Sequence, residues 1–155
     1  MSKETTPGDL KSQLAAIFCE KLDDIIKINR DQLTFEYVDI SQTQELMLEL
    51  QAVNIKHELH DAFLYKRKIT VPTAEGEHIC LVGFIYDGVR EVPWHTSTVV
   101  GVDMQNKVIK TKSGSYYRVK NFVEGEGHVN LLMHICAVAH QNGWGEHFGI
   151  SPIFY

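Results

Sequence analysis

The sequence lacks the features that mark a membrane protein, a secreted protein or a disulfide-stabilised protein. No apolar run approaches the roughly 20 residues that a membrane-spanning helix needs. The N-terminus, MSKETTPGDLK, has no apolar segment typical of a secretion signal. The three cysteines, Cys19, Cys80 and Cys136, are far apart, which excludes CxxC metal or redox motifs and argues against a disulfide framework. We therefore expect a cytoplasmic protein with buried, free cysteines.

The common catalytic and phosphate-binding motifs are also missing. No GxSxG, GxxxxGK[ST] or GxGxxG sequence occurs. His57 and His60 could share a metal ion on a helix, but on a strand their rings would face opposite ways. His128, His134 and His140 recur every six residues, about 120° apart around a helix, so they cannot chelate together. We predict no metal site and no cofactor.

What is present is the composition of an ordinary globular domain. The chain has 155 residues, of which 44% are hydrophobic and 23% charged, and this balance supports one packed core. No repeat, linker or low-complexity tract divides it. We therefore predict a single α+β domain over residues 1–155, with residues 1–6 frayed.

The first part of the chain predicts two helices and one strand. Thr6 and Pro7 are suited to the start of a helix, and apolar residues then recur at helical spacing from Leu10 to Ile25. Residues 33–38 alternate at period two, as in a strand. Ser41 and Gln44 match a capping box that would begin a second helix. Residues 53–65 fit both a helix and a strand, and we favour a continuation of the helix, with a break near Asn54 left open.

The second part predicts a sheet followed by a helix. Five candidate strands are separated by short turns, which imply antiparallel pairing: 68–73, 78–86, 96–104, 107–112 and 115–122. A third helix should run from His128 to Gln141 and end at Asn142-Gly143. The predicted fold is thus a five-stranded antiparallel meander, with closure into a partial barrel left open, packed with N-terminal and C-terminal helices.

One candidate binding surface is electrostatic. Residues 105–121 carry five basic side chains and no acidic one, whereas the whole chain has a net charge of −5. If the two strands face the same way, basic charge and an aromatic ring would lie together, which suits a phosphate backbone or an acidic partner. The alternative is a solvated hairpin whose lysines prevent edge pairing. The residues are Lys107, Lys110, Lys112, Tyr116, Arg118 and Lys120.

A second candidate surface is aromatic and includes the C-terminal tail. Tryptophan and tyrosine are common in ligand pockets and binding hot spots, and residues 147–155 carry large apolar side chains that should be buried on the domain or across a dimer contact. The residues are Trp94, His95, Trp144, His147, Phe148 and Tyr155.

These patterns predict a non-catalytic binding or adaptor module, with a protein partner or self-association as its mode of action. A small-molecule ligand stays open. One alternative is a nucleic-acid-associated protein that uses the basic hairpin, with weak affinity. The other is a small enzyme with a histidine-based site.

Overall fold

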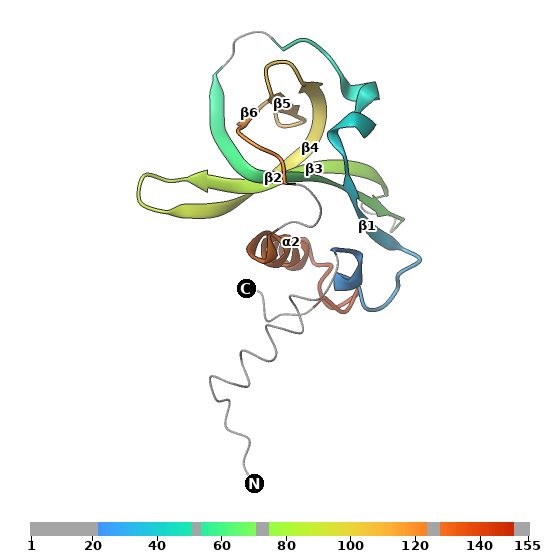
Figure 1. The fold of residues 1–155 in the computed structure, drawn as a ribbon. Helices are drawn as coiled ribbons and strands as arrows, with labels where there is room; N and C mark the ends of the chain where they lie inside the picture. Colours follow the sequence, from blue (N-terminus) through green and yellow to red (C-terminus); the bar gives the residue numbers. More distant parts are fainter. Residues whose placement is uncertain (1–21, 51–53, 71–74, 124–127, 151–155) are drawn as a thin grey trace.

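The computed structural model describes residues 22–50, 54–70, 75–123 and 128–150. Within these ranges, six strands form one mixed sheet and a single α-helix follows them (Figure 1). The predicted fold, a five-stranded antiparallel meander with a helix at each end, is therefore wrong. The elements are η1 (Leu22–Ile25), β1 (Leu33–Val38), η2 (Ile40–Gln42), η3 (Gln44–Leu46), β2 (Ile55–Ile69), β3 (Gly76–Tyr86), β4 (Glu91–Asp103), β5 (Val108–Thr111), β6 (Tyr116–Val119) and α2 (Val129–Gln141).

Strands β2 to β6 close into a barrel. Consecutive strands pair antiparallel, and β6 then returns to pair in parallel with β2, from Ile55↔Tyr116 to Leu59↔Val119. A closed meander of five strands must bring its first and last strands parallel, which is why the sheet is mixed. Figure 1 shows β4, β5 and β6 curving round to the start of β2. The β2–β6 ladder thus covers the two edges that a simple five-stranded meander would leave free.

A bend in β2 allows this closure. Asp61 has a φ of 49°, in the left-handed region that Asp tolerates better than most residues, and the register with β3 shifts between His60 and Phe63. Such a bulge increases the local twist of a strand. One edge of β2 therefore pairs with β6 before the bend and with β1 after it, from Leu64↔Val38 onward.

Two hydrophobic cores lie on opposite faces of β2. Leu59 and Leu64 point into the barrel, whereas Phe63 and Tyr65 point toward α2. The barrel core also contains Leu81, Ile85, Val99, Val102, Ile109, Tyr117 and Val119, and the helix core contains Phe35, Ile69, Leu131, Ile135, Phe148 and Ile150. The period-two alternation of strand side chains thus supplies both cores from one strand.

Helix α2 and the turn after it seal the second core. The Nδ1 atom of His128 accepts a hydrogen bond from the Asn130 amide at 3.0 Å and so caps the helix start. Gly143, with a φ of 80°, follows the helix end in the left-handed conformation that glycine favours. The predicted helix over 128–141 is confirmed to within one residue. The carbonyl of Phe148 then accepts a bond from the Lys27 amide at 2.8 Å, which ties this turn to η1.

The helices predicted before the sheet need correction. Most of the stripe from Leu10 lies outside the described residues; at its end, Leu22–Ile25 forms the 3₁₀ helix η1, with Leu22 and Ile25 buried. The Ser41–Gln44 capping box does not form. Instead Asp39 and Gln42 form one, two residues earlier, and it begins only the single turn η2.

The helix favoured over 53–65 is wrong, because the segment is a strand from Ile55 onward. It belongs to the 15-residue strand β2, which also absorbs the start of the strand predicted at 68–73 and ends at Ile69. Its apolar residues fit both periods, and pairing with β1, β3 and β6 decides in favour of the strand. The strand predicted over 33–38 is confirmed as β1.

Substitution of Gly83 tests the tightness of the barrel. A Cβ there would lie 2.9 Å from the Cβ of Ala62 and 3.1 Å from the Cβ of Leu59, atoms that move only with the backbone. Gly83→Ala should therefore lower the free energy of unfolding by about 1–3 kcal/mol in urea denaturation, as overpacked cores do. Gly101→Ala is the control, because its new Cβ meets the end of the Leu48 side chain, which is 44% exposed and can move aside. Equal stability of both variants would contradict this account.

Candidate functional site

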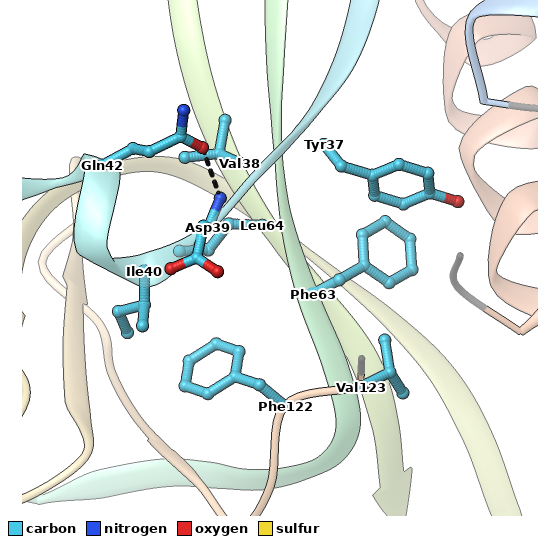
Figure 2. Close-up of a pocket in the computed structure, with 9 residues that line it drawn as sticks. All are labelled: Tyr37, Val38, Asp39, Ile40, Gln42, Phe63, Leu64, Phe122 and Val123. Atoms are coloured by element: carbon cyan, nitrogen blue, oxygen red, sulfur yellow. Dashed lines mark hydrogen bonds between the residues drawn. The ribbon is translucent and has the colours of Figure 1, made fainter. Parts of the chain in front are cut away.

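The candidate site lies where the edge of β2 passes from one partner strand to the next. After β6, the chain runs beside β2 as far as the bridge between Ala62 and Phe122. Farther along β2, the pairing with β1 starts at Leu64, which lies opposite Val38, the last residue of β1. Between these two partners is a cavity of about 540 Å³. We call it the Asp39 pocket (Figure 2); its lining residues are Tyr37, Val38, Asp39, Ile40, Gln42, Phe63, Leu64, Phe122 and Val123.

Three aromatic rings form much of its apolar surface. Phe63 is 4% exposed, and its ring meets that of Tyr37 edge to face at a centroid distance of 5.2 Å. Phe122 is half-buried and packs against the barrel core. Figure 2 shows the rings of Phe63 and Phe122 bordering the open space, while the Tyr37 hydroxyl points away from it. The pocket therefore offers aromatic surface to a ligand.

Asp39 supplies the charge of the pocket. Its Oδ1 atom accepts hydrogen bonds from the Ser41 amide at 2.8 Å and the Ser41 hydroxyl at 2.7 Å. These bonds favour the charged form and lower the pKa of the Asp39 carboxyl, the amide making the larger contribution. Figure 2 shows the carboxylate extending into the space bordered by Ile40, Phe63 and Phe122. An ionised carboxylate thus stands beside aromatic surface.

The local sequence fixes this carboxylate in place. Asp39 ends β1 and is the N-cap of η2, and the Gln42 Oε1 atom accepts a bond from the Asp39 amide at 2.7 Å. The two side chains therefore hold each other reciprocally, as in a capping box. Sequence reasoning missed this site because it assigned the box to Ser41 and Gln44. Asp39 and Gln42 have the same three-residue spacing as Ser41 and Gln44, and they directly follow a predicted strand. The sequence therefore contained a signal for the capping box that forms.

The structure brings part of the predicted basic surface together. Lys110 lies directly opposite Tyr116 in the β5–β6 ladder, with its Nζ atom 5.7 Å from the Tyr116 ring. Arg118 shares that face, two residues farther along β6, and is exposed. Glu58 pairs with Arg118 in the parallel ladder, so an acid borders the basic face. Lys107, Lys112 and Lys120 are exposed outside the two strands.

Trp94 and His95 lie on β4 but serve different cores. The Trp94 ring packs at the barrel, 4.4 Å from the His57 ring, with the Lys56 Nζ atom 5.3 Å from its centroid. The His95 Nε2 atom is 2.5 Å from the Tyr65 hydroxyl at the edge of the helix core. Burial lowers the pKa of His95 to about 4, with a smaller effect from Arg67. At neutral pH the uncharged ring and the Tyr65 hydroxyl therefore share a hydrogen bond.

The aromatic residues near the C-terminus are used in packing where they are described. Phe148 is 0% exposed, and the Trp144 ring lies 4.7 Å from the Arg67 guanidinium carbon. His147 is exposed, and its Nε2 atom is 2.6 Å from the Gln32 Oε1 atom. Tyr155 lies outside the described residues. The complete burial of Phe148 leaves it no surface for a partner, and a binding role for Trp94, His95, Trp144 and His147 stays a prediction.

The described residues contain no group of three or more His, Cys, Asp and Glu side chains placed to hold a metal ion. His57 and His60, the best pair in the sequence, are separated by the strand: His57 packs on Trp94, and the His60 Nε2 atom is 2.9 Å from the Glu91 Oε1 atom. Cys80 and Cys136 are buried. In the part of the chain that the structure describes, no helix has the length and apolarity to cross a membrane.

Comparison with known proteins adds no relative to this picture: no protein-family model, no curated protein and no solved structure matches the chain.

The neutral state of His95 predicts a pH-dependent stability. Its pKa is about 4 in the folded chain against 6.5 for an unperturbed histidine, so between these values the unfolded chain binds more protons and stability falls as the pH falls. From pH 7 to pH 5 we expect a loss of about 2 kcal/mol from this residue, to which the lowered pKa values of His57, His78 and His134 add. Urea denaturation at both pH values measures it.

Two variants identify the cause. His95→Gln should remove about 2 kcal/mol of that difference, whereas Tyr65→Phe should retain it, because burial is the larger cause of the shift. An unchanged pH dependence in His95→Gln would contradict the assignment.

Proposed function

We propose that this protein is a non-catalytic binding module and that the Asp39 pocket receives its ligand. The proposal rests on one observation: a single cavity of about 540 Å³ is lined both by aromatic residues and by one oriented carboxylate. Ligand sites have volumes of about 300–1,000 Å³ and combine apolar surface with a few fixed polar groups. The pocket meets both criteria.

The chemistry of the lining favours binding over catalysis. Asp39 is the one carboxylate among the described lining residues, and these include no histidine, cysteine or lysine beside it. Efficient general acid–base catalysis needs a group whose pKa lies near the working pH, whereas the hydrogen bonds from Ser41 lower the pKa of Asp39. The Tyr65–His95 pair, which supports the alternative of a histidine-based enzyme, lies on the helix side of the sheet, and neither residue lines the pocket.

Binding of nucleic acid or of an acidic partner through the hairpin is a second candidate function. The shared face of Lys110, Tyr116 and Arg118 favours it. The bordering Glu58 and the net charge of −5 act against it. We therefore rank it below ligand binding in the Asp39 pocket.

A cytoplasmic location and self-association remain part of the proposal. The packing of Phe148 and Ile150 against the helix core favours docking of this part of the tail on its own domain. Residues 151–155, which include the rest of the predicted dimer contact, lie outside the described residues.

Blocking the pocket tests the principal proposal. Val123 lines the cavity, so Val123→Trp should fill it, whereas Val89→Trp places the same ring at a site that is 86% exposed. We expect a ligand-observed NMR screen with anionic, neutral and cationic fragments to find binders that are lost in Val123→Trp and retained in Val89→Trp. Amide spectra of both variants verify the fold. If no fragment binds, or if every binder tolerates Val123→Trp, the proposal is wrong.

The second candidate has its own test. Any affinity for single-stranded or duplex nucleic acid should be weak and should fall steeply from about 50 to about 200 mM salt, because one hairpin supplies few phosphate contacts. Lys110→Glu with Arg118→Glu should abolish it in fluorescence anisotropy. The control is Lys68→Glu with Arg90→Glu, which makes the same change of charge at exposed sites outside the hairpin. Equal loss in both double variants would exclude the hairpin as the binding surface.

A further inference from the structure

We propose that the Asp39 pocket selects organic cations, specifically an alkylammonium group attached to a larger apolar body. This inference rests on the proposed function and adds the chemical class of the ligand. It is carried by the position of one carboxylate and the Phe122 ring on the same cavity.

The electrostatics of the lining exclude an anionic ligand. No lysine, arginine or histidine is among the described lining residues. The Ser41 amide at the start of η2, which could otherwise bind an anion, already donates to the Asp39 carboxylate. An anion would therefore meet a like charge and no side-chain cation among the described lining residues.

A neutral apolar ligand fits the walls but not the carboxylate. Covering Asp39 with a group that cannot pair with it would remove water from an ionised carboxylate, and this is unfavourable unless a partner replaces the water. A metal ion is also a poor match, because Ca²⁺ and Mg²⁺ need about six oxygen ligands and the described lining offers one carboxylate.

An organic ammonium ion is satisfied by both parts of the lining. Its charge pairs with the Asp39 carboxylate, of which Oδ1 is held by Ser41, and its alkyl groups pack on the face of Phe122 in a cation–π contact. The partly exposed side chains of Tyr37 and Val123 also line the cavity and provide apolar surface for the rest of the molecule. A cavity of about 540 Å³ exceeds the size of an ammonium group alone, which is why we assign a larger body to the ligand.

Matched probes test this inference by NMR titration of the full chain. Choline should bind about tenfold more tightly than 3,3-dimethylbutan-1-ol, which has the same shape without the charge. Asp39→Asn keeps an acceptor for Ser41 and should weaken choline binding about tenfold, and Phe122→Leu should weaken it while keeping an apolar wall. The control is Asp87→Asn, since Asp87 also accepts backbone bonds in a turn but does not line the pocket.

Two further probes identify the source of the cation. Benzyltrimethylammonium represents a small molecule, and Nα-acetyl-trimethyllysine amide represents a side chain of a protein partner. Tighter binding of either one, lost in Asp39→Asn, supports the proposal and indicates the source.

The outcomes separate this inference from the proposed function. Equal affinity for choline and its neutral isostere, or full affinity in Asp39→Asn, overturns the cation assignment while pocket-dependent binding of other fragments would leave the binding module intact. If no cation shifts any amide signal of the pocket at millimolar concentration and no other fragment binds, both proposals are wrong.

Discussion

The bend of β2 at Asp61 is the constraint on which the rest of the structure depends. The chain after β6 stabilises this bend through a reciprocal pair of hydrogen bonds: the Asn121 Nδ2 atom donates to the Asp61 Oδ1 atom at 2.9 Å, and the Asn121 Oδ1 atom accepts from the Asp61 amide at 3.1 Å. The Asn121 carbonyl also accepts from the Ala62 amide at 3.1 Å. Because a left-handed residue in a strand disrupts the ladder, the two bonds from the Asp61 and Ala62 amides replace backbone bonds that the bulge removes, and the side-chain bond fixes Asn121 in place.

Both the barrel and the pocket follow from that bend. Strand β6 pairs with residues 55–59 of β2 and β1 pairs with residues 64–69 on the same edge, and the bend lies between these two parts. The bend lets the first part curve into the barrel with β6 while the last part stays paired with β1. The Asp39 pocket is the junction between these two partners. It therefore depends on the topology of the fold, although none of its lining residues is unusual in type.

The sequence predicted the local features well and the non-local ones poorly. The alternation over 33–38 and the capping and end signals of 128–143 identified β1 and α2, because each of these signals is contained in its own segment. The pattern over 53–65 fitted two structures, and only pairing with residues far along the chain decided between them. The parallel β2–β6 pairing could not be predicted from turn lengths, since these describe neighbouring strands alone.

The candidate functional residues show the same division between local and non-local features. Sequence reasoning selected tryptophan, histidine and terminal aromatic residues because such residues are rare and chemically distinctive. In the fold, Phe148 is fully buried in the helix core, and Trp144 packs against that core beside Arg67. Asp39 gains its significance from its position, directly after β1 and beside a Phe122 ring that stays partly exposed. Phe63 is already buried, so Phe122 is the aromatic surface that a ligand would cover. A ligand that binds this surface only in the folded chain stabilises the fold by mass action, so binding and stability are linked at this place in the sheet.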